Sequence, residues 1–176
     1  MADAIVVAST EAEYRAFGAL IREYWGWLGD RYAAEVRLMD DVADHQGLNA
    51  ELESLATLYG PPGGKTLLAM RGEEVVGGVA YKDLHDGSCE MKRMYVPPRF
   101  HGQGTGRLLC QALVAQATAD GYALMRLDTG FRNTEAMAMY QTLGFTFCPP
   151  YQDYPPALVP HLRFMQLTLH LAEPPE

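Results

Sequence analysis

Hydrophobic and polar positions in the first third of the chain predict one strand and two helices. An uninterrupted apolar run at residues 4–8 is typical of a short buried strand. Thr10 and Glu13 then show the spacing of a capping box, which marks the start of a helix. The apolar residues that follow share one helical face: Tyr14, Phe17, Ile21, Tyr24, Trp25 and Leu28. After a polar, irregular segment at 29–46, a second helix is expected over about 48–59, with the stripe Leu48, Leu52, Leu55 and Tyr59.

From residue 65 onward the pattern becomes typical of strands alternating with helices. Tight turns predict an antiparallel meander of three strands, 65–71, 74–81 and 88–96. The later elements are expected to be a helix at 104–119, a strand at 122–128, a helix at 134–143, and strands at 145–148 and 163–171 joined by a loop, 149–160. A helix between two strands requires a crossover, which makes those strands parallel. The predicted fold class is mixed α/β (α+β): a mostly antiparallel mixed sheet with one parallel crossover pair and helices on both faces.

Composition and charge narrow the class of partner. The 176 residues favour a single domain, and 14 Lys and Arg against 22 Asp and Glu give a net charge of −8. An acidic protein of this kind binds polyanions poorly, so neither nucleic acid nor an anionic membrane surface is expected as a partner. Three widely separated cysteines and an N-terminus without a signal-peptide pattern predict a cytoplasmic protein. The sequence leaves a homodimer open.

The most informative segment is the glycine-rich loop that joins the strand 88–96 to the helix 104–119. It reads His101-Gly-Gln-Gly-Thr-Gly-Arg107, with three alternating glycines. Glycine lets backbone amides approach a ligand, and the first turn of a helix offers unpaired N–H groups at its positive end. Together they favour a phosphate site, although tight helix packing would also explain the glycines. The spacing matches neither the dinucleotide fingerprint nor the nucleotide P-loop.

This loop and two further segments resemble the GNAT superfamily of acyl-CoA-dependent N-acetyltransferases. Residues 101–106 are similar to its motif [QR]-x-x-G-x-[GA], with His101 where Gln or Arg is usual. The strand 90–97 also looks like the family's, and 133–145 is similar to its N-x(2)-A-x(3)-Y-x(2)-L-G-F pattern. The resemblance covers about residues 65–150, the acetyl-CoA-binding core. It implies a single GNAT-like domain, 1–176, with acceptor-side helices at 1–60 and a C-terminal loop and strand at 151–176.

The resemblance implies transfer of an acetyl group from acetyl-CoA to a primary amine of an unidentified small molecule or peptide. The strand backbone would pair with the pantetheine arm, and Asn133 would bond that arm from the opposite side. One strand amide would polarise the thioester oxygen. The implied cofactor-binding residues are Met94, Tyr95, Val96, His101, Gly102, Gln103, Gly104, Thr105, Gly106, Arg107 and Asn133. Arg99 and Arg107 flank the loop and could supply the charge that His101 lacks.

Three residues are candidates for proton transfer. Tyr140 is the expected acid for the leaving thiolate, with a packing role as the alternative. Glu90 is the expected base, because a carboxylate on a central strand should face a polar cleft, unless it is paired with Lys92 or an arginine. Asp128 is the rival base at the carboxyl end of a parallel strand, and a turn-stabilising role is its alternative. No metal site is expected, because the histidines show no ligand spacing.

The acceptor side is expected to combine aromatic rings with a carboxylate. Residues 151–156, rich in tyrosine and proline, would form one wall, with Trp25 or Trp27 opposite. A proline-stiffened connection with buried tyrosines is the alternative. A module of the same fold that binds acyl-CoA without turnover, as a sensor or partner subunit, is the second functional hypothesis.

Overall fold

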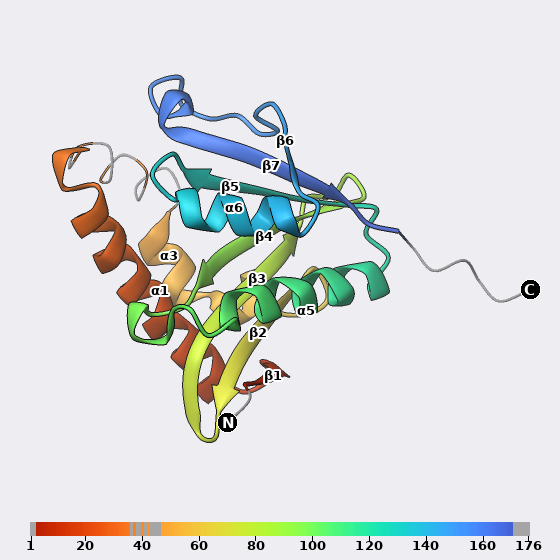
Figure 1. Ribbon diagram of the computed structural model, residues 1–176. Helices are drawn as coiled ribbons and strands as arrows, with labels where there is room; N and C mark the ends of the chain where they lie inside the picture. The colour runs from red at the N-terminus through yellow and green to blue at the C-terminus, as the bar shows by residue number, and fades with distance from the viewer. Residues whose placement is uncertain (1–2, 36, 38–39, 41, 43–46, 171–176) are drawn as a thin grey trace, which may run out of the picture.

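A single mixed sheet forms the centre of the molecule. The computed structural model describes residues 3–35, 37, 40, 42 and 47–170, and within them seven strands lie in the order β1-β2-β3-β4-β5-β7-β6 (Figure 1). The strands are β1 (Ala4–Val7), β2 (Gly64–Arg71), β3 (Glu74–Asp83), β4 (Ser88–Tyr95), β5 (Leu124–Gly130), β6 (Thr146–Phe147) and β7 (Leu162–Thr168). β4 and β5 are parallel, and the other neighbouring strands are antiparallel. The predicted mixed sheet with one parallel pair is confirmed.

Helices cover both faces of this sheet, as the sequence predicts. They are α1 (Glu11–Arg31), α3 (Leu48–Glu53), α4 (Leu55–Leu58), α5 (Thr105–Ala119) and α6 (Thr134–Thr142). The capping box at the start of α1 forms with both of its reciprocal hydrogen bonds. Alternation along β2 divides the core: Leu67 packs in the cluster of α5 and α6, whereas Leu68 packs in the cluster of α1 and α4. None of the described helices is long and apolar enough to cross a membrane.

The expected helix at 48–59 differs from the structure, which breaks it at Ser54. The Ser54 hydroxyl donates to the carbonyl oxygen of Ala50 at 2.7 Å, and its φ of −135° is not helical. A serine that bonds the backbone in this way competes with helical pairing. The apolar stripe continues across the break, so periodicity alone does not reveal it. The chain after α1 includes a short 3₁₀ turn at Ala33–Glu35, and the expected end of the last strand, residue 171, lies outside the described residues.

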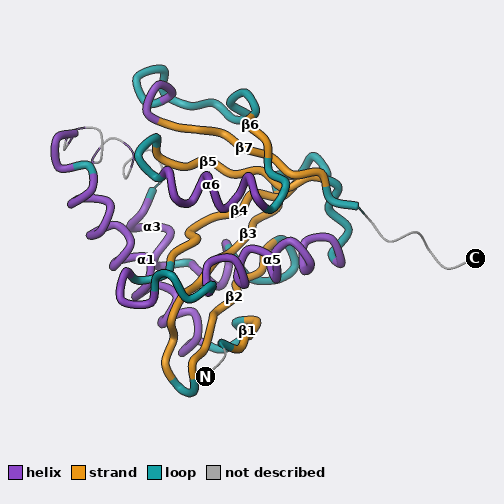
Figure 2. The backbone as a smooth tube through the Cα atoms, viewed as in Figure 1, coloured by secondary structure: helices purple, strands orange, loops and turns teal. Residues whose placement is uncertain are grey.

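The parallel pair β4–β5 is short and then splits. Its register covers three positions, the last of which joins Glu90 to Arg126. Beyond that position β4 continues to Tyr95 and β5 continues to Gly130, with no pairing between the two strands. Figure 2 shows the two strands spreading apart toward their carboxyl ends. Open sheets of this kind place ligands in the crevice outside the carboxyl ends of their strands.

A bulge in β4 lies beside the split. Ala80 pairs with Lys92 and Gly78 pairs with Tyr95, so β4 contains one residue more than β3 between these positions. Arg93 occupies the bulge with a left-handed φ of 58°, which a residue with a Cβ atom adopts only when its surroundings enforce it. The neighbouring contacts therefore matter for the shape of the cleft.

An ion pair from α3 holds Arg93 in this conformation. Its Nε donates to Oε1 of Glu51 at 2.7 Å, and its Nη2 donates to Oε2 of the same carboxylate. Tyr59 donates a third hydrogen bond to this carboxylate at 2.8 Å, and the Trp25 ring covers the guanidinium at 5.4 Å. Burial opposes ionisation of Glu51, but the hydrogen bonds and charge of Arg93 outweigh it and lower the pKa of that carboxyl.

We expect Glu51→Gln to lower the free energy of unfolding by about 3 kcal/mol at pH 7, because it leaves a buried guanidinium without its counterion. Urea unfolding measures this change. The folded-state pKa of Glu51 lies below its ordinary value of 4.5, so the pair stabilises the fold above that pH. Its contribution is lost as the pH falls through the lowered pKa, and the two proteins should then converge in stability.

Glu11→Gln is the matched control, because Glu11 forms an exposed ion pair with Arg15 on α1. Exposed pairs contribute little, so this variant should unfold at the same urea concentration as the wild type. Equal stability of the wild type and Glu51→Gln at pH 7 would contradict the structural role of the ion pair.

Candidate active site

Three cavities among the described residues bear on function, and the most spacious of the three lies in the split between β4 and β5. Its volume is about 650 Å³, and α6 and the loop before α5 complete its walls. All of the sequence-predicted cofactor residues except Gln103 line it: Met94, Tyr95, Val96, His101, Gly102, Gly104, Thr105, Gly106, Arg107 and Asn133. Tyr140, the candidate acid, lines the same cavity. The structure thus brings together residues that lie up to 46 positions apart in the sequence.

The glycine loop forms an anion cradle at one end of this cavity. Gly102 and Gly104 have φ values of 74° and 84°, a conformation that favours glycine. A Cβ atom at either position would meet nothing within 4 Å, so the backbone faces open space. Gly104 is also the N-cap of α5, and no side chain caps the amides of the first helical turn. These N–H groups and the positive end of the helix suit a phosphate group.

The basic side chains near the cradle are already engaged. Nε2 of His101 lies 2.7 Å from the carbonyl oxygen of Val96, and because a carbonyl only accepts, this nitrogen carries the proton. That N–H is therefore directed at the strand carbonyl and not at the cradle. Arg107 donates to the Thr142 hydroxyl at 2.7 Å, and Arg99 pairs with Glu23 outside the cavity lining. Backbone amides are the main anion ligands that the loop offers.

The start of α5 is anchored by a residue that sequence reasoning missed. Asp3 accepts a hydrogen bond from the Thr105 hydroxyl and another from Arg71 Nε at 2.8 Å. The bond from Thr105, with further help from Arg71, lowers the pKa of the Asp3 carboxyl. Thr105 is buried and its hydroxyl is bonded to the N-terminal segment, so its backbone, rather than its side chain, serves the cradle. No local pattern links two residues 102 positions apart.

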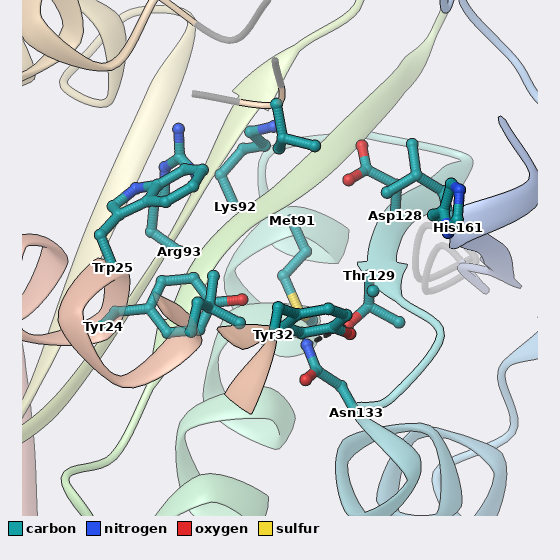
Figure 3. A pocket seen from close by; sticks show the side chains of 14 residues that line it. Tyr24, Trp25, Tyr32, Met91, Lys92, Arg93, Asp128, Thr129, Asn133 and His161 are labelled. Carbon is teal, nitrogen blue, oxygen red and sulfur yellow. Dashed lines mark hydrogen bonds between the residues drawn. The ribbon is translucent and has the colours of Figure 1, made fainter. Parts of the chain in front are cut away.

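A second, smaller cavity of about 80 Å³ meets the first (Figure 3). Trp25 and Arg93 lie on one side of it, and Asp128 and His161 lie on the other. Three residues line both cavities and so mark the junction: Tyr24, Thr129 and Asn133. A thioester in the larger cavity and an acceptor in the smaller one would meet at this junction.

One polar atom at the junction has no hydrogen-bond partner among the described residues. Asn133 Nδ2 donates to the Thr129 hydroxyl at 3.1 Å, whereas its Oδ1 is buried and accepts no hydrogen bond from the described residues. A buried amide oxygen without a donor is costly, so this atom fits an N–H group of a ligand. Burial raises the pKa of the Tyr24 phenol to about 12 and raises that of Tyr140 well above 10. Both phenols are therefore protonated at neutral pH.

The two candidate bases occupy different positions. Asp128 lines the small cavity and also a third cavity of about 390 Å³, and it accepts a hydrogen bond from the Tyr154 hydroxyl at 3.0 Å. Glu90 lines only the third cavity and is 1% exposed. Its carboxylate pairs with Lys92 at 3.0 Å and accepts a hydrogen bond from Gln152. Asp128 is thus next to the junction, whereas Glu90 is held in a structural ion pair.

Only some of the residues that the sequence predicts for the acceptor side line these cavities. Tyr154 and Gln152 line the third cavity, whereas Asp153 lies outside the three linings. Trp25 lines the small cavity and Trp27 lines the large one. His45 lies outside the described residues, and the described part of the chain holds no group of His, Cys, Asp and Glu suited to a metal ion.

Comparison with known proteins agrees with this geometry. The sequence profile of the Acetyltransferase (GNAT) family matches residues 20–145. The chain belongs to the GNAT family. It is 35% identical over 127 residues to an uncharacterised N-acetyltransferase of Schizosaccharomyces pombe, a match that covers 70% of this chain and 76% of that protein.

Solved structures of GNAT-type proteins share the fold. A candidate acyl-CoA N-acyltransferase from Klebsiella pneumoniae is 28% identical and superposes with a TM-score of 0.72 over 96% of this chain and 98% of that one. A candidate acetyltransferase from Salmonella typhimurium, solved with its cofactor acetyl-CoA, has a TM-score of 0.64 at 20% identity, over 100% of this chain and 99% of that one. The GNAT-like fold expected from the sequence is confirmed.

If the glycine loop holds the pyrophosphate of CoA, Gly104→Glu should weaken CoA binding at least about 100-fold. The new carboxylate would stand in the open space of the cradle, where two like charges about 4 Å apart repel by about 4 kcal/mol at a dielectric constant near 20. Gly104→Ala is the control, because it imposes the same backbone strain without the charge and should change the affinity less than about fivefold. Calorimetric titration with CoA measures both, and wild-type affinity in the glutamate variant would mean that the loop is only structural.

Proposed function

We propose that this GNAT family member is an N-acetyltransferase that moves an acetyl group from acetyl-CoA to a primary amine of a small molecule or peptide. The observation that carries the proposal is the meeting of two cavities at Tyr24, Thr129 and Asn133. One cavity ends in an anion cradle and the other contains a carboxylate. The Salmonella neighbour solved with acetyl-CoA supports the same cosubstrate here.

The residues of the larger cavity fit CoA. Among the described strands, none pairs with β4 on its β5 side after Glu90, so its backbone groups there are available to pair with the amides of the pantetheine arm. The unsatisfied Oδ1 of Asn133 would accept an N–H bond from the same arm, and the cradle at 102–107 would hold the pyrophosphate. Acetyl-CoA supplies the thioester that the amine attacks. A backbone amide of Met94, Tyr95 or Val96 would stabilise the negative charge on the thioester oxygen.

Asp128 is the base that the geometry favours. An ammonium must lose a proton before its nitrogen can attack, and a carboxylate beside the junction can accept that proton directly or through water. Asp128 lines the small cavity, whereas Glu90 is paired with Lys92 and does not line it. Of the two candidate bases that the sequence leaves open, we therefore propose Asp128.

Tyr140 is the acid in the proposed mechanism. It lines the CoA cavity, and because burial raises its pKa, the phenol keeps its proton until a strong base appears. The departing thiolate would form in the same buried cavity, where loss of hydration also raises the basicity of its sulfur, so it can accept this proton. Tyr140 would donate its proton to the sulfur and regain one from the solvent or the amine.

Release of free thiol tests the function itself. Acetyl-CoA incubated with the protein and a panel of primary amines should release CoA only when a suitable amine is present. Tight acetyl-CoA binding without release for any amine would instead favour the module that binds acyl-CoA without turnover.

For the base, we expect Asp128→Asn to lower kcat/KM about 100-fold or more at neutral pH, the usual effect of removing a general base. Activity should recover partly at high pH, where the amine is already deprotonated. Glu90→Gln is the comparison: it should lower stability, because Lys92 loses its partner, and should leave the shape of the pH–rate profile unchanged. If Glu90→Gln instead lowered kcat/KM in a way that high pH restores, and Asp128→Asn left kcat/KM unchanged, Glu90 would be the base.

For the acid, Tyr140→Phe should reduce kcat by about 100-fold or more while the dissociation constant for acetyl-CoA changes little, because the ring still packs. Steady-state kinetics and calorimetry measure the two quantities. Tyr24→Phe provides a comparison at the junction, where removal of the other buried phenol should have a smaller effect on kcat. Turnover within about threefold of the wild type in Tyr140→Phe would leave that residue a packing role only.

A further inference from the structure

The third cavity, of about 390 Å³, is lined by an unusual number of charged side chains. They come from α3 and three neighbouring strands, and they are Glu51, Lys82, Glu90, Lys92, Arg93 and Asp128. Lys82 and Glu90 are directly opposite one another in the β3–β4 register, so their side chains lie on the same face of the sheet. The cavity size is within the range of small-molecule sites, about 300–1,000 Å³.

Most of these charges cancel in pairs. Arg93 is paired with Glu51, and Lys92 is paired with Glu90. Lys82 and Asp128 remain. No carboxylate of the described residues lies within ion-pair distance of Lys82, and Asp128 has no cationic partner in that part of the chain.

Both remaining side chains are half-buried, so their charges are partly removed from water. Such charges are stabilised by a partner of opposite sign. Asp128 does accept a hydrogen bond from Tyr154, but a hydroxyl does not neutralise its charge. The cavity thus offers one cation and one anion to whatever binds in it.

We propose that the acceptor is a zwitterion: a small amine, of the amino-acid type, that also carries a carboxylate. Its amine would lie at Asp128, which borders the junction with the CoA cavity, and its carboxylate would bind Lys82, which lines the third cavity. This inference rests on the proposed acetyltransferase function and narrows its substrate class.

The local charges override the expectation from net charge. A chain with a net charge of −8 attracts cations in general, which would favour amines without a carboxylate. Within the site, however, Lys92 and Arg93 lie on the wall opposite Asp128, as Figure 3 shows, and Lys82 adds a third cation to the connected cavity. A purely cationic acceptor would leave Lys82 unmatched, whereas a zwitterion pairs with both free charges.

The test uses matched acceptors on the 176-residue protein with saturating acetyl-CoA. A set of L-amino acids is compared with the corresponding decarboxylated amines and with the amino-acid amides, and the thiol released is measured. We expect kcat/KM to be about 10- to 100-fold higher for the best amino acid than for its amine or amide, which is the effect of one charge-assisted hydrogen bond.

Variants of Lys82 locate the carboxylate site. Lys82→Gln should raise KM for amino acids about 10-fold or more and remove the preference, while the acetyl-CoA affinity stays unchanged. Lys82→Arg keeps the charge and should keep the preference. Arg15→Gln, which removes a positive charge from an exposed pair on α1, is the control for net charge and should behave as the wild type.

The outcomes separate this inference from the proposed function. Rapid turnover of decarboxylated amines with no preference for amino acids would overturn the inference and leave the acetyltransferase function standing. No thiol release from any acceptor, despite acetyl-CoA binding, would overturn the function. In that case, calorimetric titration of the amino acids into the CoA-saturated protein decides the inference: binding that needs Lys82 supports a carboxylate site, and no binding overturns it.

Discussion

The site depends on one constraint, the early end of pairing between β4 and β5. Three paired positions join the strands, and beyond Glu90 and Arg126 they separate. Among the described strands, the split leaves a row of backbone groups on β4 without a strand partner and opens the cavity of about 650 Å³ between the two strands. It also places Asp128 and Thr129 of β5 across from the end of β4, where the cavities that we propose for the acceptor and for CoA meet. If β4 and β5 were paired along their whole length, the space between them would close and neither proposed substrate could bind there.

A buried ion pair keeps the split in shape. Arg93 occupies a left-handed bulge of β4 that costs free energy by itself, and Glu51 of α3 holds its guanidinium with two hydrogen bonds. Glu51 thus ties α3 to β4. The same bulge presents Arg93 and Lys92 to the cavities that we propose for the acceptor. Structural stability and the charge pattern of the site therefore depend on the same residues.

Much of the fold could be predicted because its signals are local. The tight turns that bound β2 and β3, the capping box at Thr10 and the glycine loop at 101–107 each depend on residues within a few positions. The site could be predicted only in part. Sequence alone names Glu90 and Asp128 as candidate bases and Lys92 as a possible partner of Glu90. Only the structure shows that Glu90 is paired with Lys92, whereas Asp128 has no cationic partner among the described residues. The links from Asp3 to Thr105 and from Glu51 to Arg93 span 102 and 42 positions, beyond any local pattern.

A crystal structure of the protein with bound CoA would show whether the split between β4 and β5 is the cofactor site. We expect the pantetheine arm to lie in this split, with an amide nitrogen bonded to Oδ1 of Asn133 and the sulfur within hydrogen-bonding reach of the Tyr140 hydroxyl. The pyrophosphate should contact the amides at 102–107. CoA bound on another surface, or β4 and β5 paired beyond Glu90 and Arg126 with no room for the arm, would contradict it.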